Sequence, residues 1–385
     1  MAVAFAVGDI LVPAHELAER ARHDDMARLR EKPATELAFR AGTTTGHAVA
    51  EAIAAASPGE YAPIGIGRPL SLEIFSIYTG DAPGRWLPIG PKPGLLAVSA
   101  VKDLVTVDAA PRAMNQIVEK IEDRKLYEPG ALAAGTPIVY YSPAVTTETL
   151  FTSFQLVVDS FDRRVIDHVA DLFQSAGGLP IFAPAAAYLL AGSVLLRIAG
   201  DLGDALAESD AFLDDDLPLR FLPPDTMPDV ARSAVIYNDK HAHELEGYRV
   251  AVVTEGPDQR QRRVLADRQT GQPYHGDAPY MIVSIDGRER DGLEGFQPTY
   301  ATAAVLERFY PKGDRTGQAV QALSDGLALY NDLRYRRKAE DLRQRLEGLD
   351  PQSDEYKELK TLYDAYRKNI ANELLQLKDP VAAGG

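Results

Sequence analysis

A stretch of 25 residues without a charged side chain lies between Asp171 and Arg197. A run of this length is sufficient to span a bilayer as a helix, so it decides first between a membrane protein and a soluble one. Pro180 and Pro184 interrupt the run, and a proline inside a helix removes a hydrogen bond and clashes with the preceding turn. Pro184 fits better in the first turn of a new helix, where its missing N–H costs nothing. The sequence therefore predicts a soluble protein with a mostly buried apolar helix over 184–207.

The composition is that of an acidic globular protein. Hydrophobic residues make up 45% and charged residues 25% of the 385 residues, and this length exceeds the usual size of a single core. We therefore expect two or three domains. The formal net charge is −15, and an acidic body repels phosphate backbones, so the charge argues against a nucleic-acid partner. Residues 314–379 carry 12 Lys/Arg and 13 Asp/Glu, so nearly all of the excess acid lies before Asp314.

The chain contains no cysteine. This excludes disulfides, thiolate metal sites and a cysteine nucleophile. The N-terminus has no Lys or Arg before Arg20, so it lacks the charged start of a signal peptide. We expect a cytoplasmic protein without stable membrane insertion.

Hydrophobic spacing and turn residues predict both helices and strands. Helix-type signals are present in the first 57 residues, over 111–124 and over 298–311. Strand-type patterns occupy eight short runs: 70–74, 95–101, 138–141, 150–158, 233–238, 248–254, 263–266 and 280–285. Asp/Gly/Pro clusters separate the last four runs, which predicts an antiparallel meander.

The expected fold class is α+β, with a mixed or antiparallel β-sheet core, packed helices and a C-terminal antiparallel helical hairpin. Apolar stripes on both sides of a break at Asp350-Pro351 predict the hairpin. An acidic, proline-rich passage over 208–229 is a plausible boundary between subdomains. We divide the chain into an N-terminal helical segment (1–65), an α/β subdomain that contains the buried helix 184–207 (66–222), a β-meander subdomain (223–311), and the helical hairpin with its tail (312–385).

Two groups of residues are candidate metal ligands. His241 and His243 precede a predicted strand, and in an extended chain residues two apart face the same side, so both imidazoles can meet one ion. A polar loop that leads into a strand explains the same pattern. Asp214 and Asp216 belong to an acidic run that offers oxygen ligands to a hard cation such as calcium. A solvated loop of mutually repelling carboxylates is the competing interpretation.

Two further segments are candidate anion sites, and each has a simpler explanation. The loop over 42–46 precedes an expected helix at His47, and small residues at a helix N-terminus can hold a phosphate. Ordinary N-capping explains the same residues. Arg334, Arg336, Arg337 and Lys338 form a basic patch in the predicted hairpin. A solvated face whose cations pair with nearby carboxylates is the favoured interpretation of this patch.

No catalytic constellation is present in the sequence. The chain has no GxSxG elbow, no HExxH pair and no GxxxxGK[ST] loop. We therefore expect a non-enzymatic scaffold that binds a protein partner or forms a homo-oligomer, without a cofactor other than a divalent metal at the residues above. Tyrosine is enriched at interfaces, and the predicted hairpin is rich in it. The candidate interface residues are Tyr330, Tyr335, Tyr356, Tyr363 and Tyr366. Packing of these tyrosines within the chain itself is equally compatible with the sequence.

Two other classes of function remain open. One is a metal-dependent hydrolase that uses His241 and His243 together with acidic residues. The other is a membrane-active protein that inserts the segment 172–207, although the polar stripe of this segment has one arginine beside two aspartates. Interfacial helices usually carry Lys and Arg there, so electrostatics opposes insertion at neutral pH.

Overall fold

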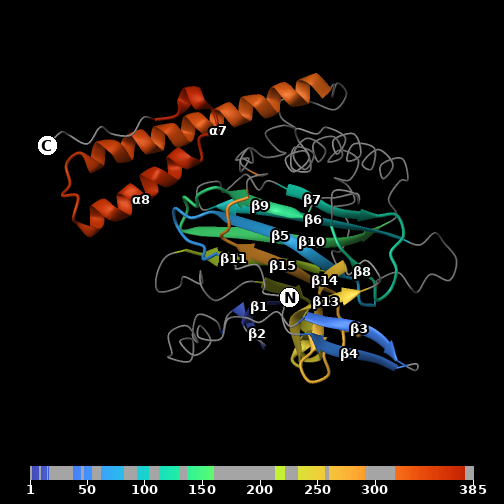
Figure 1. The fold of residues 1–385 in the computed structure, drawn as a ribbon. Helices are drawn as coiled ribbons and strands as arrows, with labels where there is room; N and C mark the ends of the chain where they lie inside the picture. The colour runs from blue at the N-terminus through green and yellow to red at the C-terminus, as the bar shows by residue number, and fades with distance from the viewer. Residues whose placement is uncertain are drawn as a thin grey trace.

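The computed structural model contains antiparallel β-sheets and a few helices, which confirms the α+β class at a coarse level (Figure 1). The structure describes residues 2–7, 10–14, 16, 38–44, 47–53, 62–81, 93–103, 112–129, 137–159, 213–221, 233–255, 260–290, 293 and 317–377. The expected apolar helix 184–207, the wider segment 172–207 and the expected helix 298–311 lie outside the described residues. Among the residues that are described, no helix has both the length and the apolar character needed to cross a membrane.

A seven-stranded sheet forms the middle layer of the molecule. Its strand order is β2-β1-β12-β15-β5-β8, and β9 also pairs with β5. All of these pairings are antiparallel. The strands are β1 (Ala2–Val7), β2 (Ile10–Pro13), β5 (Leu70–Tyr78), β8 (Leu126–Tyr127), β9 (Ile138–Ser142), β12 (Ser233–Tyr237) and β15 (Tyr280–Asp286).

A four-stranded antiparallel sheet covers one face of this layer. Its strand order is β11-β10-β6-β7, with bounds β6 (Gly94–Asp103), β7 (Arg112–Val118), β10 (Thr149–Asp159) and β11 (Leu213–Arg220). Phe5 from β1, Leu72 from β5 and Phe154 from β10 are fully buried in one cluster between the two sheets. Successive residues of a strand point to opposite faces, so Phe5 contributes to this core while Ala4 and Ala6 face the other side.

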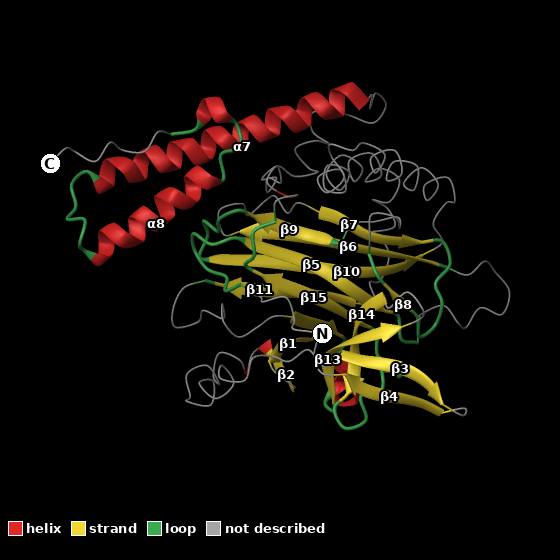
Figure 2. Ribbon diagram, in the orientation of Figure 1, coloured by secondary structure: helices red, strands yellow, loops and turns green. Residues whose placement is uncertain are grey.

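A second four-stranded sheet packs on the opposite face of the middle layer. Its strand order is β14-β13-β3-β4, with bounds β3 (Ala38–Thr44), β4 (His47–Ile53), β13 (Tyr248–Glu255) and β14 (Arg260–Asp267). Val250 and Leu265 pack into a cluster with Tyr78 and Tyr280 of the middle layer. The pair β13–β3 is parallel, and the other pairs in this sheet are antiparallel. The molecule is therefore built of three stacked β-layers (Figure 2).

Two long helices follow the β-layers in the chain. They are α7 (Gly317–Leu346) and α8 (Asp354–Lys368), and the short helix η3 (Glu373–Leu375) comes after them. Ser353 caps α8, because its hydroxyl accepts a hydrogen bond from the backbone N–H of Tyr356 at 3.1 Å. Buried residues from both helices form one apolar cluster, which we call the α7–α8 core: Tyr335, Ala339, Leu342, Leu346, Tyr363, Tyr366, Ile370 and Leu377.

Asn369 connects the end of α8 to the middle β-layer. Its side-chain amide donates hydrogen bonds to the carbonyl oxygens of Ala144 at 2.6 Å and of Ala365 at 2.8 Å. The hydroxyl of Ser142, at the end of β9, donates to the Asn369 side-chain oxygen at 3.2 Å. This amide is 5% exposed, so water does not compete for these hydrogen bonds.

The prediction of helices in the first 57 residues is wrong where the structure describes them. Residues 2–7, 10–13, 38–44 and 47–53 form strands. These segments are rich in alanine, a strong helix former, but strand pairing overrides a weak intrinsic propensity. The loop over 42–46 is correspondingly not a helix N-terminus. Thr44 pairs with His47, so two residues connect β3 to β4 as in a tight hairpin.

The helix predicted over 111–124 is also wrong, and a β-bulge explains the error. β7 occupies Arg112–Val118, and its register against β6 shifts between Ala97 and Val98. Met114 and Ile117 therefore pair with Val98 and Leu96, which are two apart on β6. An extra residue in one strand produces a spacing of three, which imitates the period of a helix.

Strand pairing joins segments that we expected to belong to different domains. β1 pairs with β12, and β3 pairs with β13, so residues before 65 share sheets with residues after 223. The passage over 208–229 contains β11, which pairs with β10 of the same predicted subdomain, so the boundary at 222 stays a prediction. The predicted meander is wrong as well: its four strands are real, but β12 and β15 lie in the middle layer and β13 and β14 in another sheet.

Candidate functional site

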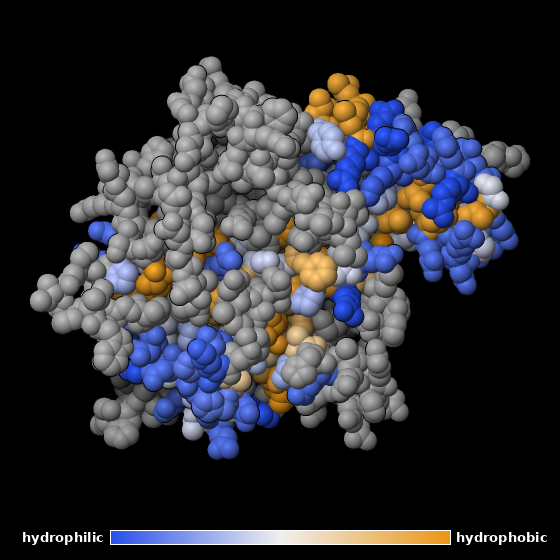
Figure 3. All heavy atoms as spheres, turned by 180° about the vertical axis from the view of Figure 1, so that it is seen from behind, coloured by the Kyte–Doolittle hydropathy of each residue, from blue (hydrophilic) through white to orange (hydrophobic). Residues whose placement is uncertain are grey.

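Four large hydrophobic side chains remain exposed near the junction of α7 and η3. Leu329 is 46% exposed, Tyr330 58%, Leu333 47% and Leu374 89%, and they are the exposed large hydrophobic residues of the part of the chain that the structure describes. We call these four residues the outer α7 surface. Figure 3, which views the molecule from behind, shows a hydrophobic group at the top of the helical pair. A cluster of this kind on a folded protein typically marks a contact site.

The spacing on α7 explains why three of these side chains lie together. Leu329 and Leu333 are four residues apart, and Tyr330 precedes Leu333 by three, so all three share one side of the helix. Tyr335 and Leu342 are 3% and 6% exposed in the α7–α8 core, and their helical positions place them on the opposite side. α7 therefore has an inner side that packs against α8 and an outer apolar side.

A buried carboxylate holds the segment with Leu374 against α7. Asp332 is 2% exposed and accepts hydrogen bonds from the backbone N–H groups of Ala371 at 3.0 Å and Asn372 at 2.9 Å. The side-chain oxygen of Asn372 then accepts from the N–H of Leu374 at 3.0 Å, which caps η3. These hydrogen bonds fix the turn on which Leu374 projects, so this leucine belongs to an ordered surface.

Cationic side chains follow the outer α7 surface along the helix. Arg337 is exposed and lies one turn beyond Leu333. Arg336 pairs with Glu340 at 3.0 Å, while the Lys338 ammonium donates to the Tyr366 hydroxyl at 3.3 Å. Both partners of the Arg336–Glu340 pair are more than one-third exposed, so the pair contributes little to stability.

The five candidate interface tyrosines separate into two groups. Tyr335, Tyr363 and Tyr366 are 3%, 0% and 8% exposed within the α7–α8 core, and Tyr356 packs against the same cluster. Tyr330 is the exposed member. Most of the tyrosines of this region therefore serve the contact between the two helices, and Tyr330 alone of the five belongs to the outer α7 surface.

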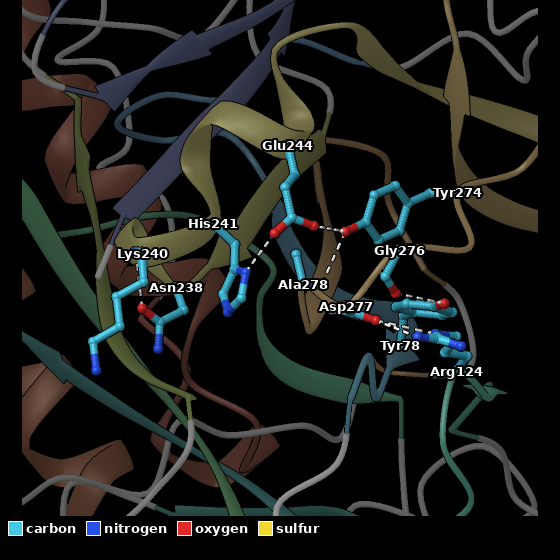
Figure 4. A network of polar contacts seen from close by, with 10 residues as sticks. All are labelled: Tyr78, Arg124, Asn238, Lys240, His241, Glu244, Tyr274, Gly276, Asp277 and Ala278. Atoms are coloured by element: carbon cyan, nitrogen blue, oxygen red, sulfur yellow. Dashed lines mark hydrogen bonds and ion pairs between the residues drawn. The ribbon is translucent and has the colours of Figure 1, made fainter.

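A second polar arrangement involves the first candidate histidine (Figure 4). His241 ends the 3₁₀ turn η1 (Asp239–His241), and its Nδ1 lies 2.7 Å from Oε1 of Glu244 in the short helix α5 (Ala242–Leu245). The Tyr274 hydroxyl donates to Oε2 of Glu244 at 2.6 Å and accepts from the N–H of Ala278 at 2.9 Å. One carboxylate thus connects the turn after β12 to the loop before β15.

The electrostatics of this network indicate a structural role. The hydrogen bond from Tyr274, and then the one from His241, hold the pKa of the Glu244 carboxyl below its usual value. Burial raises the pKa of Tyr274, and burial also raises the pKa of the adjacent Tyr78 to about 12. Both oxygens of Glu244 have hydrogen-bond partners, and the Tyr274 hydroxyl both donates and accepts. These groups are engaged with one another and hold two loops together.

The geometry assumed for the two candidate metal ligands differs from the one observed. His241 and His243 lie in consecutive helical turns, where residues two apart point in different directions, whereas the expectation assumed an extended chain. His243 is exposed. Asp214 and Asp216 lie in β11 opposite Gln155 and Ser153.

No group of three or more His, Asp or Glu side chains placed to hold a metal is present among the described residues. Metal binding at either pair stays a prediction.

A cavity of about 580 Å³ lies where α8 approaches the segment before β5. Its lining residues are Gly67, Thr361, Asp364, Arg367, Lys368 and Gln376. Gly67 has a φ of +79°, and a Cβ at this position would lie 2.7 Å from the Thr361 methyl group, so glycine permits the close approach of this segment to α8. Asp364 pairs with Lys360 at 2.5 Å. Because Arg367 and Lys368 also line the cavity, its wall carries both negative and positive side chains.

Comparisons with known proteins do not assign this chain to a family. No protein-family model, no curated protein sequence and no solved structure matches it.

Sequence reasoning identified Tyr330 and the basic residues but missed the three leucines of the outer α7 surface. The signal was present for two of them, because Leu329 and Leu333 are four apart and fall off the stripe that contains Tyr335, Leu342 and Leu346. Leu374 carried no comparable signal, since its position depends on the hydrogen bonds that Asp332 makes to the chain after α8.

Proposed function

We propose that the protein is a non-enzymatic interaction protein whose α7–α8 unit acts as an antiparallel helical hairpin and as its contact element. The observation that carries this proposal is the exposure of Leu329, Tyr330 and Leu333 on one side of α7, with exposed Leu374 on the segment that Asp332 holds against this helix. Burial of a large apolar side chain contributes about 1.5–3 kcal/mol, so a partner that covers these residues gains a substantial driving force.

The rigidity of the surface supports the same proposal. The α7–α8 core fixes the inner side of α7, and Asp332 fixes the turn that carries Leu374. A surface that is ordered before binding loses less conformational entropy when a partner covers it. The described β-layers, by contrast, bury their large apolar residues and leave no comparable cluster exposed among the described residues.

Site-specific photo-crosslinking tests the proposal in the full chain. A photoreactive residue at Leu333, introduced in the native host, is expected to form discrete adducts that mass spectrometry identifies and that purified components reproduce. The matched control carries the same residue at Glu358, an exposed position on α8, and is expected to form none. Equal labelling at both positions, or no adduct at Leu333, would contradict a contact role for this surface.

Self-assembly is the alternative within the same class of function. It predicts that the adduct at Leu333 contains a second copy of this chain and that the oligomer dissociates when Leu329 and Leu333 are replaced by aspartate. Sedimentation velocity over a range of protein concentrations measures this directly. A monomer at every concentration removes self-assembly and leaves a different protein as partner.

A metal-dependent hydrolase at His241 and His243 has less support. The hydrogen bond from His241 to Glu244 leaves the Nε2 atom of that ring for a ligand, which is the one observation in its favour. The test is the metal content of the purified chain by mass spectrometry, before and after His241→Ala and His243→Ala. A stoichiometric divalent ion that both substitutions remove would support the hydrolase, and its absence from the original chain would eliminate it.

A further inference from the structure

We infer that the cavity between α8 and the segment before β5 binds a small organic anion that carries a phosphate or carboxylate group. None of the residues that line this cavity belongs to the outer α7 surface, so the inference does not depend on the proposed function. Three properties of the cavity carry it: the volume, the charge of the wall and the fixed position of that wall.

The volume of the cavity is that of a small-molecule site. At about 580 Å³ it lies within the range of about 300–1,000 Å³ that is typical of such sites, and a bare inorganic ion needs far less room. The wall is polar, because besides its charged side chains it includes the Thr361 hydroxyl, the Gln376 amide and Gly67, which has no side chain. The cavity therefore suits a polar organic molecule rather than an apolar one.

The wall of the cavity is positive once its own ion pair is taken into account. Arg367 and Lys368 line the cavity, and Asp364 is the one carboxylate among its lining residues. Lys360 donates to both oxygens of Asp364, at 2.6 and 2.5 Å, and Nη1 of Arg367 lies 4.0 Å from the same carboxylate. Lys368 is exposed, and the ion pairs of the described part of α8 do not include it. A ligand inside the cavity therefore meets more positive than negative charge.

Charged residues outside the wall do not reverse this balance. In α8, Lys357 pairs with Asp354 at 3.4 Å. Exposed Arg68 directly follows the lining glycine and adds a cation. The exposed carboxylates Glu358, in α8, and Glu373, in η3, are not among the lining residues. Water screens such exposed charges, so the charges that act most strongly on a ligand are those of the wall.

The C-terminus of α8 opposes an anion only weakly. The end of a helix carries partial negative charge on carbonyl groups that lack a partner. Here the N–H of Asn369 donates to the carbonyl oxygens of Ala365 at 3.3 Å and of Tyr366 at 3.2 Å, and the N–H of Ile370 donates to that of Arg367 at 3.1 Å. These carbonyl groups are engaged with the chain itself, and the two cations of the last turn offset the remaining dipole.

Hydrogen bonds hold both sides of the cavity in place. On one side, the N–H of Gly67 donates to the carbonyl of Val145 at 2.8 Å. On the other, Asn369 follows the lining Lys368 and donates to the carbonyl of Ala144 at 2.6 Å. A site that is ordered before binding loses less conformational entropy when a ligand enters. A bound molecule contacts α8 and the segment before β5 at once, so binding should strengthen the connection between them.

Matched small molecules test the inference with the full-length chain. Glucose 6-phosphate carries a phosphate group, gluconate carries a carboxylate, and glucose is their uncharged counterpart. At one ionic strength set with potassium chloride, isothermal titration calorimetry is expected to show saturable binding of at least one of the two anions and none of glucose. Which anion binds identifies the charged group that the site takes. Hydrogen exchange should slow in 65–68 and 361–370 on binding, which places the ligand at the cavity.

Variants of the chain identify the residue responsible. Lys368→Gln should weaken binding of the anion about tenfold, because it removes one charge-assisted hydrogen bond, and Lys368→Arg should retain binding. The matched control is Lys125→Gln, which removes the same charge from an exposed lysine beyond the far end of β5, and it should leave binding unchanged. Circular dichroism of each variant verifies that the helices are retained.

Every other result overturns the inference. Neither anion binds, glucose binds equally well, or inorganic phosphate alone binds as tightly as the organic anions: each of these results excludes an organic-anion site. Full binding by Lys368→Gln, or an equal loss in Lys125→Gln, excludes this cavity as the place of binding. Crosslinking at Leu333 is independent of all these results, so the failure of the anion site leaves the proposed function standing, and the reverse also holds.

Discussion

The two sides of α7 carry the same residue types, which are buried on one side and exposed on the other. On the inner side, Tyr335 is 3% exposed and Leu342 6% exposed in the α7–α8 core. On the outer side, Tyr330 is 58% exposed and Leu333 47% exposed. The difference teaches that tyrosine and leucine content does not by itself locate an interface in this helix, because the same residue types build its packing and its exposed surface.

The largest effect is expected from truncation on the inner side of the pair. Tyr363→Ala should destabilise the α7–α8 unit by about 3–5 kcal/mol, because it removes a fully buried aromatic side chain and leaves a cavity. Thermal unfolding followed by far-UV circular dichroism measures the loss. A variant that unfolds at the same temperature as the original chain would show that the α7–α8 core is not the main support of these helices.

The next largest effect is expected from Asp332, which joins α7 to the segment after α8 that carries Leu374. Asp332→Ala should cost about 1–3 kcal/mol, because the backbone N–H groups of Ala371 and Asn372 lose a charged acceptor in a buried position. Hydrogen exchange of the segment 371–377 should accelerate more than exchange within α8. Equal acceleration throughout both helices would indicate global loosening and would remove the assigned role of Asp332 in positioning Leu374.

A smaller effect is expected from Glu244, a carboxylate of the short helix α5 that likewise accepts two hydrogen bonds. The pKa of Glu244 is lowered in the folded protein, so its stabilisation is present above the unfolded pKa, near 4.5, and is lost as pH falls through the folded value. The stability difference between the original chain and Glu244→Gln should therefore shrink in acid. Denaturant titrations at a series of pH values measure it, and a difference that stays constant below this range would contradict the assignment.

The smallest effect on stability is expected on the outer side of α7. Leu333→Ser should change the free energy of unfolding by no more than about 0.5 kcal/mol, because its side chain is already half exposed. The same variant should lose any partner contact at this surface. A marked destabilisation by Leu333→Ser would show that the outer side is part of the chain's own core, which would end the contrast between the two sides.

Much of the β-structure could be predicted from the sequence. The strands that begin near Leu70, Ile138, Ser233 and Tyr280 consist of consecutive or alternating apolar residues, and their burial follows from that pattern alone. The break at Asp350-Pro351 falls between α7 and α8. These features depend on local sequence, which is why reasoning from spacing located them.

The errors have a physical origin in long-range pairing. β1 is alanine-rich and becomes a strand because β12 and β2 pair with it on both sides. β11 contains three consecutive aspartates and Pro218, residues that strands usually avoid, but it ends the order of its sheet, where charge and proline are tolerated. No local pattern specifies which segment will supply a hydrogen-bonding partner.

The candidate site could be predicted only in part for the same reason. Tyr330 and the cluster of basic residues were evident from composition, whereas the exposure of Leu329 and Leu333 depends on which side of α7 meets α8. The backbone at His241 and His243 was expected to be extended and is helical, and the partner of His241 is Glu244, three residues along.

The buried amide of Asn369 gives the helical pair a mechanical connection to the rest of the molecule. It holds the carbonyl of Ala144, just beyond β9, and the carbonyl of Ala365 in α8. β9 pairs with β5, which lies within the middle layer. Tension applied to α8 by a load on the helices is thereby transmitted to a strand of the central sheet. Among the described residues, this amide and the close approach of Gly67 to Thr361 are the contacts through which α8 meets the β-layers.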